Sequence, residues 1–285
     1  MMVQPGQDEQ LQLVRALFPS LARDFESMSA PAAGSGAAAE FDAWLDREAG
    51  AVLAGAAFTA ITDPAVAGRF DTAFARARAA ARLLEAELPE PEAFAAAGSD
   101  LGHFGELLGD RPDLVPVPAP YGLGIDRWRA AFTRAGSAHP DVLNSADGVS
   151  PLILAADAER GFDALDRIPE GAGPLPVVAQ RPSSGAVARW TLRLVPGEPT
   201  PSLLGLGFAH GPHVSLPELL MLQLMRILAG EQPIDTGTFT WLAGSIADGR
   251  LAARHVYDAG ERVIRITCRE TGNQGPHLGS RAPLA

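Results

Sequence analysis

The chain has 285 residues, of which 47% are hydrophobic and 20% are charged, which is typical of a globular protein. All 23 basic residues are Arg, so chemistry that needs a Lys Schiff base and phosphate loops that need a Lys are both excluded. The formal net charge of −11 argues against nucleic acid as a partner, because binding through phosphate neutralisation needs an excess of positive charge.

The sequence has one cysteine, Cys268, which limits the metal centres and cofactors that the chain can bind through thiolates. One thiol cannot form an intramolecular disulfide, and it cannot supply the several thiolates of a zinc or iron–sulfur centre. Residues 1–10 lack the basic and apolar regions of a signal peptide, and no apolar stretch is long enough to span a bilayer. We therefore expect a cytoplasmic protein with no membrane contact, no metal and no cofactor.

The N-terminal segment, residues 1–26, is predicted to be a tethered amphipathic helix, because apolar side chains recur at helical spacing over 8–26. Small residues with Gly and Pro follow over 27–39, which predicts a flexible linker. Two alternatives follow for this helix. It docks on the rest of the chain, or it binds a protein partner as a helix in a groove.

Residues 40–149 form the predicted helical region. Two Ala-rich helices are expected over 40–62 and 64–87, because Asp63 followed by Pro64 is typical of a helix start. A shorter helix is expected after the second of them, to about residue 97.

The proline-rich segment 110–124 cannot be helical, so it is predicted to be an extended connector. Asp126 is then expected to cap a helix that runs to about residue 135. Its Trp128 and Phe132 need a core to pack against. An alternative therefore stays open in which the regions before and after residue 150 share one core.

Residues 150–285 are predicted to form an α+β domain. Ser215 and Glu218 have the spacing of a capping box, and the helix after them, 216–229, is apolar on nearly every side. It should therefore lie buried under a sheet. A three-turn helix is expected over 158–168, and a glycine-rich loop over 271–285. Strands are expected over 151–157, 174–180, 188–196, 203–210, 238–245, 250–258 and 261–270. The expected fold is α+β, with a helical N-terminal region followed by a mainly antiparallel sheet and one buried helix.

Three segments of the C-terminal half carry a recognisable pattern: FTWLAGS at 239–245, the DGR turn at 248–250, and GNQGPHLGS at 272–280. Their order after SLPELL resembles an uncharacterised actinobacterial family, known only as a domain of unknown function. In that family the strand before the tail has more aromatic residues and the tail carries a Trp, whereas this chain has Val263, Ile266 and Cys268. The resemblance implies an α+β fold for this half and no particular activity.

Histidines form the first group of candidate catalytic residues. His210 and His213 lie three residues apart before the helix 216–229, and His213 and His277 each follow a rigid Gly-Pro pair. We expect His213 and His277 to face a common cleft, where His210, His213 or His277 could act as acid or base. A metal site would need a third ligand, which could be His255, His277, Asp235 or Asp258. The alternative is that all are loop histidines bonded to the backbone or to solvent.

Three arginines on the last two predicted strands, Arg254, Arg265 and Arg269, are candidate ligand-binding residues. Together with the helix start beside His213, they could bind a carboxylate or phosphate, because backbone N–H groups at a helix start also attract anions. The alternative is a solvated sheet face on which these arginines pair with Asp and Glu.

Cys268 is expected on an apolar strand face, beside Ile264 and Ile266. A lone cysteine at such a place usually fills the core. The alternative is a nucleophile activated by His255 or His277.

These features leave two classes of function. The first is an accessory or interaction protein that binds a protein partner or a small anionic ligand. The second is a hydrolase, lyase or isomerase that uses histidine acid–base chemistry without an organic cofactor. A homo-oligomer is compatible with both classes.

Overall fold

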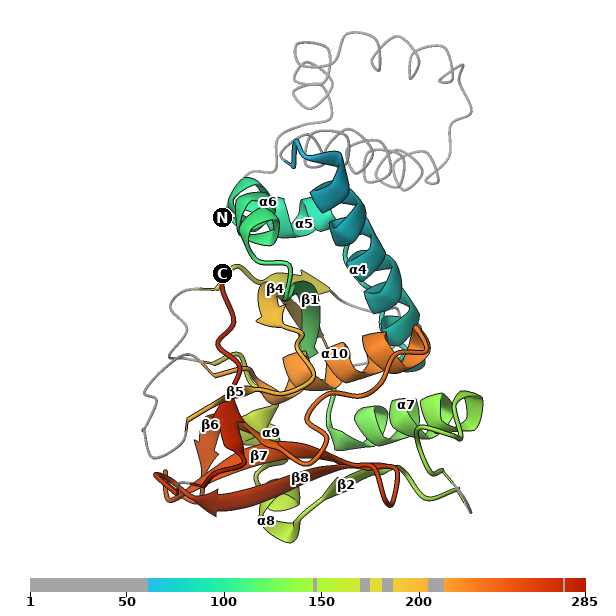
Figure 1. The fold of residues 1–285 in the computed structure, drawn as a ribbon, viewed down its shortest axis with the longest axis vertical. Coiled ribbons are helices and arrows are strands. Elements are labelled where there is room, and N and C mark those ends of the chain that lie inside the picture. The colour runs from blue at the N-terminus through green and yellow to red at the C-terminus, as the bar shows by residue number, and fades with distance from the viewer. Residues whose placement is uncertain (1–60, 146–147, 170–174, 181–186, 205–212, 274) are drawn as a thin grey trace, which may run out of the picture. The chain divides into compact units, whose positions relative to one another are not determined.

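Two β-sheets with a helix between them organise the described part of the chain (Figure 1). The computed structural model describes residues 61–145, 148–169, 175–180, 187–204, 213–273 and 275–285. One sheet has three strands in the order β1-β4-β3, and the other has six in the order β2-β8-β7-β6-β9-β5. The predicted α+β fold is confirmed. The predicted N-terminal helix, the linker and nearly all of the helix 40–62 lie outside the described residues.

The helix α4, Pro64–Leu83, begins where the sequence predicts. Asp63 accepts hydrogen bonds from the backbone N–H groups of Ala65 at 2.8 Å and Val66 at 3.2 Å. The short helix α5, Pro91–Ala96, is also confirmed. A further helix, α6 (Leu101–Asp110), was not predicted, although its buried residues recur at helical spacing.

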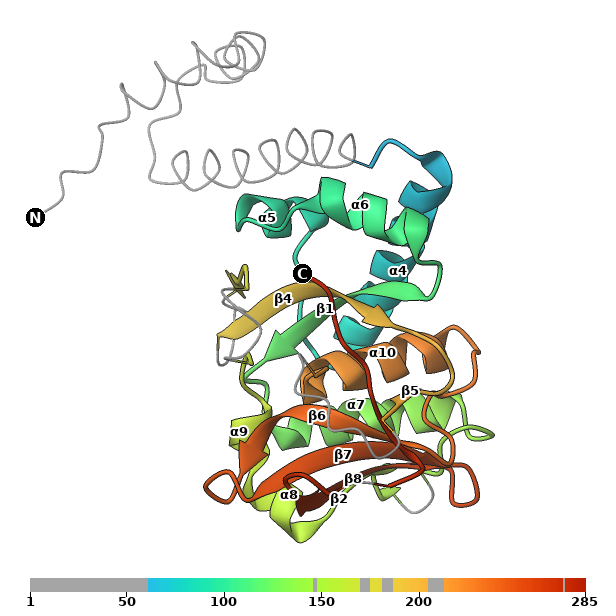
Figure 2. The same ribbon diagram turned by 60° about the vertical axis from the view of Figure 1, so that its left-hand side comes forward.

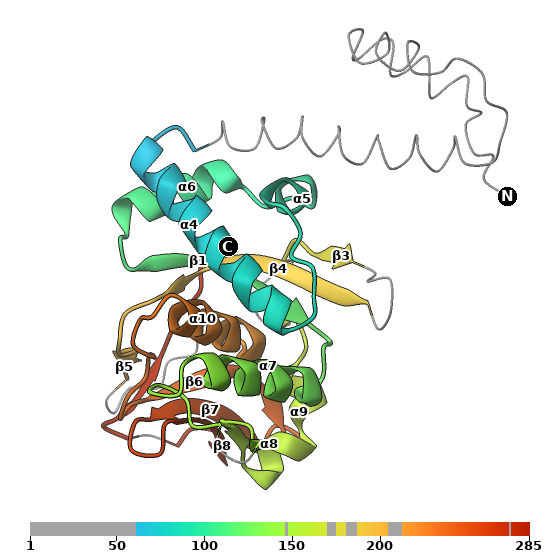
Figure 3. The same cartoon turned by 90° about the vertical axis from the view of Figure 1, so that its right-hand side faces the viewer.

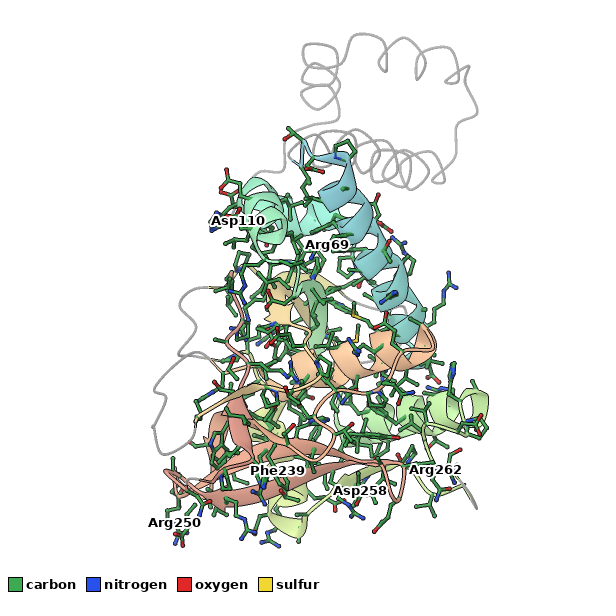
Figure 4. All side chains as sticks on the ribbon, in the orientation of Figure 1. Arg69, Asp110, Phe239, Arg250, Asp258 and Arg262 are labelled. Atoms are coloured by element: carbon green, nitrogen blue, oxygen red, sulfur yellow. The ribbon has the colours of Figure 1, made fainter. Side chains whose placement is uncertain are left out.

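Arg69 of α4 ties that helix to the segment that follows α6 (Figure 4). Its guanidinium donates to the backbone carbonyls of Leu108 at 2.5 Å, Pro112 at 3.0 Å and Leu114 at 3.1 Å. These carbonyls lie where a helix ends and a strand begins, so Arg69 satisfies acceptors that the helix itself leaves without a donor.

The proline-rich segment is a buried strand, β1 (Leu114–Tyr121), rather than a connector. Only its extended conformation was predicted. β1 pairs antiparallel with β4 (Ala188–Pro196), and it lies at an edge of the three-stranded sheet. Its prolines occupy alternate positions, 116, 118 and 120. Successive N–H groups of a strand point to opposite edges. The three prolines, which have no N–H group, therefore all face the edge of β1 that pairs with no other strand of this sheet.

The next helix, α7 (Ile125–Ala138), buries Trp128 and Phe132 as expected. The prediction that Asp126 caps it was wrong, because the cap residue is Gly124, and Asp126 lies in the first turn. An acidic side chain there still interacts favourably with the positive end of the helix dipole.

The chain then enters the six-stranded sheet through β2 (Leu152–Leu154), which runs parallel to β8. The predicted three-turn helix is instead two short helices, α8 (Ala156–Arg160) and α9 (Phe162–Leu165). They are separated at Gly161, where a Cβ atom would lie 2.5 Å from a methyl carbon of Ile246. Close packing against the sheet therefore explains the glycine at this break.

The helix α10, Leu216–Leu228, lies between the two sheets (Figure 2). The predicted capping box is present, with the Ser215 and Glu218 side chains each bonded to the other's backbone N–H. Its residues are buried on nearly all sides, as expected. Figure 3 shows why: β1 and β4 lie on one side, the six-stranded sheet on the other, and α4 and α7 beside it.

Three of the predicted strands in the last third of the chain form two hairpins. Strands β6 (Phe239–Ile246), β7 (Leu251–Asp258) and β8 (Val263–Glu270) pair antiparallel in sequence order. The tail adds a strand that was not predicted, β9 (Leu278–Ser280), parallel to β6. The two remaining strands are short: β3, Val178–Gln180, and β5, Ser202–Leu203.

A buried ion pair fixes α10 to the three-stranded sheet. Arg193 of β4 donates from Nε and Nη2 to the two carboxylate oxygens of Glu218, both at 2.6 Å. The Tyr121 hydroxyl lies 2.8 Å from the Ser215 hydroxyl, which in turn donates to Glu218 at 2.9 Å. Residues from before and after residue 150 therefore meet in one polar network, and they also share one hydrophobic core. The shared core that the sequence left open is the arrangement observed.

Candidate functional site

The outer face of the six-stranded sheet, turned away from α10, carries all three arginines predicted as ligand-binding residues, Arg254, Arg265 and Arg269. His255 and Tyr257 of β7 are buried, so the alternating Arg254 belongs to the other face. Register places Arg254 between Trp241 of β6 and Thr267 of β8. Figure 4 locates Phe239, the labelled aromatic residue of β6, on this sheet.

Arg254 is held in place by an aromatic ring and a hydroxyl. Its guanidinium carbon lies 3.9 Å from the centroid of the Phe239 ring, and its Nε donates to the Thr267 hydroxyl at 3.0 Å. Burial, together with the positive charge of Arg269, lowers the pKa of Arg254 below its ordinary value. Among the described residues, no carboxylate lies within ion-pair distance of Arg254 or Arg269. The site therefore contains two neighbouring cations that repel each other and that have no counter-ion among the residues that the structure describes.

A cavity of about 130 Å³ lies beside these arginines. Ala252 lines it and is paired directly with Arg269 in the sheet. Trp241, the direct neighbour of Arg254, lines it as well. The other lining residues in the described part of the chain are Leu204, His213, Leu242, Gly244, Ser245, Thr271 and Gly272. The cavity and the two arginines therefore adjoin on one face.

His213 brings an imidazole to this cavity. Its position follows from the backbone, because the carbonyl of the next residue, Val214, accepts a hydrogen bond from Ala243 N of β6 at 2.8 Å. Its Nδ1 is buried without a hydrogen-bond partner in the described structure. Burial lowers the pKa of His213, so the ring is neutral at pH 7. A neutral imidazole can accept one hydrogen bond and donate another.

The other predicted site residues are dispersed. Arg265 is paired with Asp258, at 3.2 Å from Nε, and with Glu261, so it matches the alternative of a paired sheet face. His277 is exposed, its carbonyl accepts from Phe239 N at 2.7 Å, and it does not line the cavity of His213. The structure thus does not bring these two histidines to one cavity. His210 lies outside the described residues.

His255 belongs to a buried polar chain that was not predicted. Its Nδ1 lies 2.9 Å from Asp235, and its Nε2 lies 3.2 Å from the Gln223 amide. Arg281 of the tail donates to the same Asp235 carboxylate at 2.5 Å. Burial alone would raise the pKa of Asp235, but His255 and Arg281 outweigh it and hold the pKa below its ordinary value. Only the tertiary fold brings these residues together, so local sequence contains no signal for them.

The contacts of His255 also decide whether it can activate the Cys268 thiol. Both ring nitrogens of His255 face other side chains, which leaves neither one directed at Cys268. Burial raises the pKa of the Cys268 thiol, whereas an activated nucleophile needs a lowered pKa. These contacts favour the structural interpretation of Cys268.

The described residues contain neither a metal-binding cluster nor a membrane-spanning helix. No group of three or more His, Cys, Asp or Glu side chains is placed to hold a metal ion there. No helix in the same part of the chain is both long and apolar enough to cross a membrane. The cytoplasmic location expected from the sequence stays a prediction.

Comparisons of the whole chain with protein-family models, with curated proteins and with solved structures found no match. The resemblance of the C-terminal half to an uncharacterised actinobacterial family therefore stays a prediction.

Proposed function

We propose that this protein binds a small anionic ligand on the outer face of the six-stranded sheet, between Arg254 and Arg269 and beside the cavity of His213. The observation that carries the proposal is the pair of arginines without a carboxylate partner in the described structure. Like charges on neighbouring strand positions repel each other. A bound anion would remove this repulsion and would form charge-assisted hydrogen bonds with both guanidinium groups.

Arg265 provides an internal comparison on the same strand and face as Arg269. Its guanidinium is neutralised by Asp258 and Glu261, as is usual for an arginine on a solvated sheet. In the described part of the chain, carboxylates therefore pair with the arginine at one end of this face and with neither arginine at the other end. This difference supports a ligand, rather than a side chain, as the partner of Arg254 and Arg269.

The cavity indicates the class of anion. Its described lining is largely apolar and includes Trp241, while His213 and Ser245 supply polar atoms. A cavity of about 130 Å³ accommodates only a small group, so the ligand places a short apolar part there and its charged group against the arginines. Small aromatic or aliphatic carboxylates and phosphate esters have this form.

Acid–base catalysis by His213 is the second candidate function. A neutral imidazole at a cavity favours it. Among the described lining residues, however, no Asp or Glu is present to orient the ring, as a catalytic histidine usually requires. Ligand binding therefore has the stronger support.

Isothermal titration calorimetry with benzoate and with phenyl phosphate tests the proposal. We expect Arg254→Gln and Arg269→Gln each to weaken binding by about tenfold, because each removes a charge-assisted hydrogen bond worth about 1.5 kcal/mol. Arg265→Gln is the matched control and should leave the affinity within about twofold of wild type. An equal loss in all three variants would indicate a general charge effect and would refute the site. The absence of binding to the wild-type protein would refute it as well.

A further inference from the structure

A second cavity, of about 560 Å³, lies at one end of the three-stranded sheet, where β1 ends, β4 begins and α9 lies nearby (Figure 2). Its size is within the range of small-molecule sites. Its described lining consists of Tyr121, Gly122, Gly124, Asp163, Asp166, Arg167, Ile168, Val187 and Arg189. It is separate from the anion site proposed above, which lies on the other sheet.

Asp166 is the unusual group in this lining. The residue is 6% exposed, and its two carboxylate oxygens accept hydrogen bonds from Gly122 N at 3.0 Å and Gly124 N at 2.9 Å. Each oxygen has a second lone pair, so the carboxylate can accept further bonds. No cationic side chain in the described structure forms an ion pair with it. Burial, with a contribution from the nearby Asp163, raises the pKa of Asp166 to about 6.

A buried carboxylate without a counter-ion is costly, and native structures usually pair such groups. Here the vacant acceptor positions lie beside a cavity that contains a second carboxylate, Asp163. A ligand ammonium group would supply the missing charge and would donate up to three hydrogen bonds.

The remaining polar residues of the cavity have the opposite charge. Arg167 and Arg189 are both exposed, and neither guanidinium group has a hydrogen-bond or ion-pair partner in the described structure. Arg189 is paired in the sheet with Tyr121, the last residue of β1, so it stands at the same end of the sheet as the Gly122 and Gly124 turn. The cavity lining thus contains two carboxyl groups and two guanidinium groups, and these guanidinium groups are unpaired within the described part of the chain.

We propose that this cavity binds a small zwitterion of the α-amino acid class. Its ammonium group lies against Asp166 and Asp163, and its carboxylate lies against Arg189 and Arg167. Ile168 and Val187, the aliphatic lining residues, provide a surface for an apolar side chain. A ligand with only one of the two charged groups would leave half of this lining without a partner.

Calorimetric titration with three matched probes tests the proposal: L-leucine, isopentylamine, which lacks its carboxylate, and 4-methylpentanoate, which lacks its amine. We expect L-leucine to bind at least about tenfold more tightly than either singly charged probe, because each lost charge removes a charge-assisted bond. Equal affinity for L-leucine and isopentylamine would overturn the proposal in favour of a simple cation site. If none of the common amino acids binds with a Kd below about 10 mM, the proposal is also overturned.

Variants at exposed positions test the assignment without disturbing the fold. Asp163→Asn and Arg189→Gln should each weaken L-leucine binding by about five- to tenfold, whereas Asp71→Asn and Arg82→Gln, on the exposed side of α4, should leave it unchanged. Binding should be about tenfold weaker at pH 5 than at pH 7, because Asp166 is then largely protonated. Unchanged affinity in both cavity variants would overturn the assignment.

Discussion

Replacing Glu218 by Gln probes the ion pair that fixes α10 to β4. Arg193 and Glu218 are almost fully buried, with side-chain exposures of 1% and 0%. Glu218 accepts two guanidinium bonds at 2.6 Å and one from Ser215 N at 2.8 Å. Glu218→Gln preserves the shape of the side chain but removes its charge. Arg193 is then left as a buried cation without a counter-ion.

The expected loss of stability is large. Removing one partner of a buried ion pair costs about 3–5 kcal/mol, since the remaining charge stays desolvated. Gln retains one oxygen that can accept from Arg193, so we expect a value near the lower limit, about 3 kcal/mol. This is a substantial share of the roughly 5–15 kcal/mol that stabilises a typical protein. For a domain of about 150–250 residues it corresponds to a fall in Tm of about 6–12 °C.

Urea unfolding followed by tryptophan fluorescence measures the effect, because Trp128 and Trp190 are fully buried. Arg193→Met/Glu218→Met is the companion variant. It removes both charges, so we expect it to be more stable than Glu218→Gln, although it loses a capping interaction worth about 1 kcal/mol. A loss below about 1 kcal/mol in Glu218→Gln would refute the reasoning. A double variant that is less stable than the single one would refute it too.

Three further predictions concern other contacts. The raised pKa of Asp166 means that the folded state retains a proton that the unfolded state releases, so the contribution of Asp166 to the free energy of unfolding should fall by about 2.5 kcal/mol between pH 4 and pH 7, and Asp166→Asn should lose this contribution. Gly279→Ala would place a Cβ atom 2.6 Å from the carbonyl oxygen of Ser202, so we expect a loss of about 1–3 kcal/mol in urea unfolding, whereas Gly275→Ala, with open space around it, should be neutral. Arg69→Met should cost about 1.5–3 kcal/mol in the same assay, because it leaves the carbonyls between α6 and β1 without their charged donor.

The candidate anion site was predictable in part. Strand alternation places Arg265 and Arg269 on one face, and this follows from sequence alone. Arg254 lies on the same face because of the register of β7 with β8. The tight turn after Asp258 sets that register. That Arg265 is neutralised while Arg269 is not depends on where Asp258 and Glu261 point. Side-chain placement of this kind has no signal in spacing.

The second cavity was not predictable. The segment 110–124 was predicted only to be an extended connector, and Asp166, which accepts hydrogen bonds from Gly122 N and Gly124 N, lies more than forty positions later in the chain. The raised pKa of Asp166 results from burial, and burial is a property of the assembled fold.

The features that the sequence alone determined depend on interactions between residues close together in the chain. The start of α4 at Asp63 and Pro64, the capping box at Ser215 and Glu218, and the three strands of the two C-terminal hairpins depend on neighbours within a few residues.

Tertiary structure decided the features that need distant partners. The proline-rich segment became the edge strand β1 because β4 supplies a ladder on the side where its N–H groups remain. The tail became β9 because β6 offers it a free edge. The buried pair of Arg193 and Glu218 exists because α10 packs against β4. In each case the free energy that stabilises the feature comes from contact with a remote part of the chain. No local sequence pattern encodes such a contact.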